Sequence, residues 1–244
     1  MQESIDPTRL GANRTGMQMS PMHGKEMLEG MDTTAPEADG QALAEARLDA
    51  IREAGVLGTV PAPATLKGVA KSGAAMLSGD RLQVFVDKLS ERLAFERGGT
   101  RLYDGVLAKF EAHPGELDEV ALEDVRDIRD EEASHALMIQ ECIFALGCDP
   151  TAQTPSADLV GVETMGLIQA VSDPRTTLAQ TLHAALAAEL ADHAGWETLI
   201  LLAESIGQDD MAARFREALQ RENEHVQKVR SWHNALTLET SELM

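Results

Sequence analysis

The sequence Glu-x-x-His occurs twice, at Glu132–His135 and at Glu222–His225. One glutamate, Glu96, lies 36 residues before the first pair, and another, Glu189, lies 33 residues before the second. Because residues three apart share one face of an α-helix, the carboxylate and imidazole of each pair can bind the same ion. The upstream distances are those of a helix, a tight turn and a second helix. The repeat therefore predicts a two-metal site inside a four-helix bundle.

The two pairs are weak evidence when taken alone. In 244 residues with 7 His and 24 Glu, chance predicts about 0.7 Glu-x-x-His matches. The prediction becomes specific only when the two upstream glutamates are added to the pattern.

Helical periodicity surrounds all six residues. Each glutamate or histidine interrupts an apolar stripe at a position that faces the core. Pro114-Gly115 ends the first helix, and the N-cap sequence Ser172-Asp173-Pro174 precedes the third. The four long helices are predicted at 80–113, 117–146, 174–206 and 210–238.

The connection over residues 148–173 is too long for a hairpin and contains a short apolar helix near 157–171. Two short-looped helix pairs joined by one long crossover is the connectivity of ferritin-like bundles. The predicted fold class is therefore all-α, a ferritin-like four-helix bundle with a crossover between its second and third helices.

The predicted bundle domain spans residues 79–240, and residues 1–78 form an N-terminal arm of irregular segments and short helices. Short helices are expected at 40–54 and 64–77, separated by a proline-containing linker. The arm also holds a methionine-rich group with two open interpretations, a copper(I) site or flexible apolar side chains. Its members are Met17, Met19, Met22, His23 and Met27.

Charge and composition exclude several classes of partner. A net charge of −20 argues against nucleic acid and anionic membranes, which both require a cationic surface. No stretch of 18 apolar residues and no signal-peptide pattern occurs, so we expect a cytoplasmic protein without a membrane span. The two cysteines, Cys142 and Cys148, are expected to be reduced and packed.

The ligand set itself indicates the metal. Unpaired carboxylates rarely lie in an apolar stripe, because burying a charged group without a partner costs several kcal/mol. Even a neutral polar group costs about 2 to 7 kcal/mol when it is buried without a hydrogen bond. Four carboxylates balance two divalent cations, and oxygen ligands mixed with imidazole suit iron or manganese. The alternative is a buried hydrogen-bonded network in a bundle that has lost its metals.

Residues 80–238 resemble the ferritin-like superfamily and, within it, the rubrerythrin-like di-iron proteins. The resemblance implies two iron ions, with manganese in one or both positions as an option. It implies as ligands Glu96, Glu132, His135, Glu189, Glu222 and His225.

Further details are similar to rubrerythrins. The spacing from Glu96 to Tyr103 matches their first helix, and Asp192 stands where they carry a second carboxylate. Asp192, His193 and Tyr103 are therefore candidates to contact the metal or one of its ligands, or else polar surface and packing residues.

Glu131 is expected on the solvated surface. The chain lacks the paired cysteines of a rubredoxin-type centre, so an enzyme would need a separate electron donor.

The resemblance implies an oxidoreductase that reacts with dioxygen or hydrogen peroxide and forms a homodimer. Two other functions stay open at this point: ferroxidase activity with iron sequestration, and a metal-free helical scaffold. The aromatic residues Tyr103, Trp196 and Trp232 are expected to pack in the core, with a redox role as the alternative.

Overall fold

The computed structural model describes residues 29, 40–63, 82–117 and 119–242. All six helices in these ranges are α-helices, and no strand occurs among the described residues. The all-α class predicted from the sequence is confirmed. The methionine-rich group and the helix expected at 64–77 lie outside the described residues.

The chain divides into two units, residues 1–56 and residues 57–243. The first contains α2 (Gly40–Glu53), which agrees with the short helix predicted at 40–54 and buries none of its residues. No helix in the described ranges combines the length and the apolar character that a membrane span requires.

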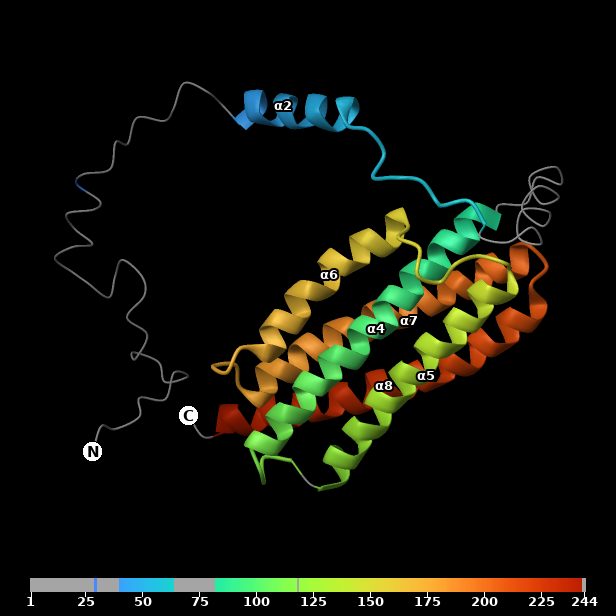
Figure 1. The fold of residues 1–244 in the computed structure, drawn as a ribbon. Coiled ribbons are helices and arrows are strands. Elements are labelled where there is room, and N and C mark those ends of the chain that lie inside the picture. The colour runs from blue at the N-terminus through green and yellow to red at the C-terminus, as the bar shows by residue number, and fades with distance from the viewer. Residues whose placement is uncertain (1–28, 30–39, 64–81, 118, 243–244) are drawn as a thin grey trace. The chain divides into compact units, whose positions relative to one another are not determined.

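The second unit is built from four long helices and one shorter one (Figure 1). These helices are α4 (Leu82–Ala112), α5 (Glu119–Ala145), α6 (Pro155–Ser172), α7 (Leu178–Ser205) and α8 (Asp209–Glu242). Helix α4 packs against α5, α6 and α7, while α8 packs against α7 and α5.

Local sequence explains where these helices end. Gly147 and Gly207 follow α5 and α7 with φ angles of 82° and 70°. The left-handed conformation closes a helix C-terminus and suits glycine, which lacks a Cβ.

The start of α7 differs from the prediction. The sequence Ser172-Asp173-Pro174 predicts a cap at that point, but the N-cap is Thr177, which forms a capping box with Gln180. Asp173 instead accepts hydrogen bonds from the backbone N–H and the guanidinium of Arg175 within the preceding turn. Two possible helix starts therefore lie close together in the sequence. The Thr-x-x-Gln pair accepts hydrogen bonds from two backbone N–H groups at the helix N-terminus, whereas the side chain of Asp173 stabilises the turn before it.

The core of the second unit consists of two hydrophobic clusters. One contains the N-terminal part of α4, the C-terminal parts of α5 and α7 and the start of α8, including Phe85, Ile139, Trp196 and Phe215. The other contains the opposite ends of the same helices. In α5, α7 and α8 the predicted ligand residues fall in the interval between the two clusters, and in α4 Glu96 follows Phe95, the first α4 residue of the second cluster. The bundle therefore has a polar layer across the middle of its core.

Asp87 on α4 fixes the N-terminus of α6, because its carboxylate accepts hydrogen bonds from the backbone N–H of Ser156 (3.0 Å) and from its hydroxyl (2.6 Å). Burial opposes ionisation of Asp87, but these hydrogen bonds outweigh it and lower its pKa.

The variant Asp87→Asn is expected to lose about 1 kcal/mol of stability at neutral pH, since it weakens hydrogen bonds to a charged acceptor. A lowered folded-state pKa contributes stability above the unfolded value near 3.8 and loses it as the pH falls through the folded-state value. Urea unfolding at pH 7 and pH 3 should therefore show a difference between variant and wild type that shrinks in acid. Asp127→Asn, at an exposed position of α5, is the matched control.

Candidate metal centre

Six buried ionisable side chains make up the polar layer. Glu96 comes from α4, Glu189 from α7, and one Glu-x-x-His pair comes from each of α5 and α8. None of the six side chains is more than 10% exposed. The structure thus brings together all six residues that the sequence singled out.

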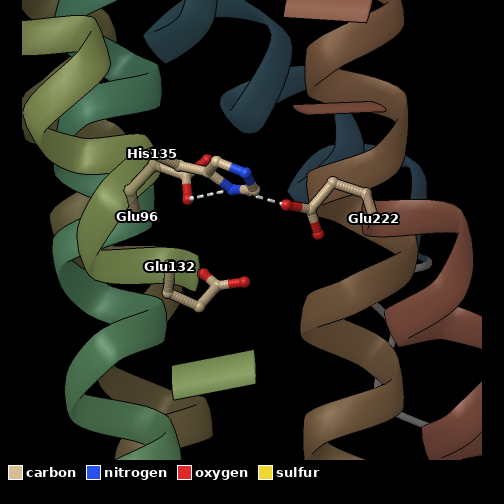
Figure 2. A group of neighbouring side chains, drawn as sticks. All are labelled: Glu96, Glu132, His135 and Glu222. Carbon is tan, nitrogen blue, oxygen red and sulfur yellow. Dashed lines mark ion pairs between the residues drawn. The ribbon is translucent and has the colours of Figure 1, made fainter. Parts of the chain in front are cut away.

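These residues form two overlapping groups, each with ligand atoms that all lie within 4.8 Å of one another. The first contains Glu96 and His135, and the second contains Glu189 and His225. Both groups include Glu132 and Glu222. Figure 2 shows the first group, with Glu222 on α8 facing the three residues from α4 and α5. Two shared carboxylates are an arrangement that two neighbouring cations could use.

Glu222 lies between the two imidazoles. Its Oε1 is 2.8 Å from Nδ1 of His135, and its Oε2 is 3.1 Å from Nδ1 of His225. His135 Nδ1 is also 3.7 Å from Glu96 Oε2, and Figure 2 marks both of these His135 ion pairs with dashed lines. His225 Nδ1 is 3.7 Å from Glu189 Oε2. Both histidines therefore present the same ring nitrogen to the layer.

Burial and mutual repulsion alter the pKa values of the glutamates. Burial raises the pKa of Glu189 to about 8, with Glu222 adding like charge. Burial also raises the pKa of Glu96 and, more strongly, of Glu132. Glu222 is the exception: burial opposes its ionisation, but hydrogen bonds with both imidazoles outweigh it and lower its pKa to about 2.

The histidines are shifted in the opposite sense. Burial disfavours their protonation, but hydrogen bonds and negative charge from the surrounding glutamates raise the pKa of His135 to about 10 and that of His225 to about 12. The layer thus concentrates negative charge that must be balanced by protons or by bound cations.

Several oxygen atoms of the layer lack hydrogen-bond donors. Both carboxylate oxygens of Glu96 and Oε2 of Glu189 are buried without a hydrogen-bond partner among the described residues. Buried polar atoms of this kind call for an ordered water or an ion. Carboxylate oxygen together with imidazole nitrogen is a donor set that suits iron, manganese or zinc. The residues present therefore fit a pair of divalent metal ions.

Tyr103 reaches the layer from α4, and its hydroxyl donates a hydrogen bond to Oε1 of Glu189. Burial and the neighbouring carboxylates raise its pKa well above the usual value, so the hydroxyl keeps its proton. Tyr103 therefore contacts a candidate ligand, as the sequence pattern suggests, and also packs in the core.

Asp192 and His193 lie outside both groups. Asp192 is buried and forms an ion pair with Arg92 of α4, whose Nη1 is also 3.5 Å from Glu96 Oε1. His193 Nε2 lies 3.0 Å from Oδ1 of Asn223. Asp192 thus contacts the layer through Arg92, whereas His193 is a polar residue at its edge.

The aromatic residues follow the packing interpretation. Trp196 is fully buried, meets the imidazole of His135 edge to face with ring centroids 5.4 Å apart, and contacts Phe215. Trp232 packs against Phe110 with centroids 6.1 Å apart. Neither Cys142 nor Cys148 forms a disulfide and both are buried, as expected.

The prediction that Glu131 belongs to the solvated surface was correct only in part. Its side chain is 37% exposed, yet its Oε2 lies 2.7 Å from Nε2 of His225. Glu131 precedes Glu132, so its Cβ points about 100° away from the core face. Its side chain is long enough to reach the neighbouring helix α8 from that position.

Sequence reasoning missed three further residues. Arg92 lies four residues before Glu96, a spacing that places both on one helix face and that could have identified it. Gly99 and Gly195 left no such signal. A Cβ at Gly99 would lie 2.1 Å from Oε2 of Glu132, and one at Gly195 would lie 2.1 Å from Nη2 of Arg92. Both glycines provide space for charged side chains from neighbouring helices.

Fold and site together define an all-α protein with buried carboxylate and histidine groups that can hold metal ions. The family described as "Domain of unknown function (DUF892)" matches residues 82–241, which include every residue of the two groups. The match covers more than half of the chain, and the chain belongs to this family. Comparisons with curated proteins and with solved structures gave no match.

Proposed function

We propose that this chain is a ferritin-like dimetal oxidoreductase that binds two iron ions, or iron and manganese, and reacts with dioxygen or hydrogen peroxide. The observation that carries the proposal is the pair of four-residue groups that share Glu132 and Glu222. Two divalent cations would match the four negative charges of the carboxylates. A single ion would leave part of the set without a function.

In this proposal each group holds one ion. Glu132 and Glu222 would be shared by the two ions, Glu96 and His135 would hold one of them, and Glu189 and His225 would hold the other. When bound, the metal pair would supply Lewis acidity and reversible oxidation. A separate molecule would supply the electrons for repeated turnover.

The chain itself contributes exclusion of water and a defined proton position. The hydrophobic clusters on both sides bury the layer, which strengthens the electrostatic interactions within it. Tyr103 holds its proton on the phenolic oxygen and donates a hydrogen bond to Glu189, which orients that carboxylate. A pocket of about 550 Å³ between α5 and α8 is lined by His135, Met138 and Arg214 among others. A small oxidant can approach the layer from this side.

Anaerobic titration of the metal-free protein with Fe²⁺, followed by addition of dioxygen or peroxide, tests the proposal. Two ions per chain and rapid, stoichiometric oxidation are expected. Fewer than two ions would contradict the dimetal site and favour the metal-free scaffold. Uptake of many ions per chain as a mineral would instead favour the ferroxidase and iron-sequestration alternative.

The variant Gly99→Ala should separate metal binding from folding. Its methyl carbon would lie 2.1 Å from Oε2 of Glu132 and would displace the flexible end of that side chain, while alanine raises helix propensity by about 1 kcal/mol. We expect at least tenfold weaker metal binding, comparable to the loss of an ordinary supporting contact at a metal site. We expect the unfolding temperature of the metal-free protein to be unchanged or higher.

Gly161→Ala is the control for this variant, because a Cβ at Gly161 on α6 meets no atom within 4 Å. It should gain the same helix propensity and bind metal like the wild type. Unchanged metal affinity of Gly99→Ala would show that the displaced Glu132 carboxylate is not a ligand.

A further inference from the structure

We propose that the two halves of the centre bind metal unequally, and that Glu131, acting through His225, makes the Glu189–His225 half the tighter one. The inference rests on the proposed dimetal function and adds an order of loading to it. One ion fills the Glu189–His225 half first, and the second fills the Glu96–His135 half at a higher metal concentration. Three differences between the halves support this order.

The first difference is the partner of each imidazole. His225 directs Nδ1 into the layer, and its other nitrogen, Nε2, lies 2.7 Å from Oε2 of Glu131. With metal on Nδ1, the Nε2–H donates to this carboxylate, which fixes the ring orientation and makes the imidazole a stronger ligand. Oε1 of Glu131 also lies 3.8 Å from Nε of Arg221, and this contact helps to hold the Glu131 side chain against α8.

His135 has no comparable support. It also directs Nδ1 into the layer, at 2.8 Å from Glu222. Within the described parts of the chain, however, its Nε2 has no protein hydrogen-bond partner. Its ring lies against the edge of Trp196 and borders the pocket between α5 and α8. Apart from the contacts of Nδ1 within the layer, the imidazole of this half is therefore positioned by packing.

The second difference is the charge beside the terminal glutamates. In the Glu96 half, the guanidinium of Arg92 lies 3.5 Å from Oε1 of Glu96, and both side chains are almost fully buried. A cation at this distance competes with a metal ion for the same carboxylate and repels the ion directly. Asp192 pairs with Arg92 and keeps it in place.

The third difference is the donor to Glu189. Its carboxylate accepts a hydrogen bond from the neutral hydroxyl of Tyr103, not from a cation. Tyr103 lies seven residues after Glu96 in the sequence, and the residue seven positions after Glu189 is Trp196. The Glu189 half thus has the Glu131 carboxylate behind its imidazole and a neutral donor on its glutamate, whereas the Glu96 half has the buried Arg92–Asp192 ion pair beside its glutamate.

The test is calorimetric titration of metal-free protein with Co²⁺ alone, with visible absorption recorded at each equivalent. The wild type is expected to bind two ions in two resolved steps. Glu131→Gln keeps the shape of the side chain and removes its charge, and it should weaken the first step by about tenfold to a hundredfold, the usual effect of losing a carboxylate behind a metal-bound histidine. The second step should change by less than about threefold, and the cobalt spectrum at one equivalent should change with the first.

Glu123→Gln is the control, because Glu123 is exposed on the same helix and the charge change is identical. His225→Asn and His135→Asn assign the steps to the halves: the first variant should remove the tight step and the second the weak one.

Two equal sites in the wild type would overturn the proposal, as would equal weakening of both steps by Glu131→Gln. Fewer than two Co²⁺ ions bound to the wild type would instead contradict the dimetal function itself.

Discussion

Glu222→Gln is expected to abolish high-affinity binding of both metal ions. Glu222 belongs to both four-residue groups and contacts both imidazoles, at 2.8 and 3.1 Å. The amide keeps the size of the side chain but has no charge and only one acceptor oxygen, so it cannot bridge two cations. The loss of affinity should exceed the roughly tenfold to hundredfold effect of removing an outer partner such as Glu131.

Equilibrium dialysis with Fe²⁺ under argon, followed by iron analysis, measures this effect directly. Glu224→Gln is the matched control, since Glu224 lies two residues further along α8 and pairs at the surface with Arg221. The control should retain two ions per chain. If Glu222→Gln also retained both ions at wild-type affinity, the shared carboxylates would not be bridging ligands.

Loading with metal is expected to raise the unfolding temperature by about 10 to 20 °C. A ligand that binds only the folded state at a hundred times its Kd stabilises by about 2.7 kcal/mol, so two ions contribute about 5 kcal/mol. In a protein of this size, each kcal/mol shifts the midpoint by about 2 to 4 °C. The ions would also relieve repulsion among four carboxylates that are all buried in one layer.

Differential scanning calorimetry of the metal-free and Mn²⁺-loaded protein measures this shift, and addition of a chelator should reverse it. Mn²⁺ avoids oxidation during heating. Glu222→Gln serves as the control, because Mn²⁺ should leave its midpoint unchanged. An equal rise in wild type and variant would mean that the ion acts outside the polar layer.

The sequence predicted the six central residues because helical periodicity converts spacing directly into position. Residues at i and i+3 must share a face, and a glutamate in an apolar stripe must enter the core. Helix α4 (Leu82–Ala112) was therefore predicted within two residues at each end. Glu96 could be assigned to the core before any tertiary contact was known.

Contacts that depend on side-chain reach between helices could not be predicted in the same way. Glu131 lies off the core face of α5, and only the proximity of α8 brings its carboxylate to His225. The space beside Gly99 and Gly195 depends on how closely neighbouring helices approach, which periodicity does not specify. The start of α7 was mispredicted for a related reason, because two capping sequences lie within a few residues of each other.

The polar layer also determines how the four long helices align with one another. The buried face of α7 is rich in alanine and leucine, and such a surface packs almost equally well in several registers. A shift of one helix by a single turn, about 5.4 Å, would move its glutamate out of the layer and into a hydrophobic cluster. The buried carboxylate would then lose both its imidazole contact and its access to a cation. The residues that form the candidate metal centre therefore set the register of the four helices, much as a single buried polar residue sets the register of a coiled coil.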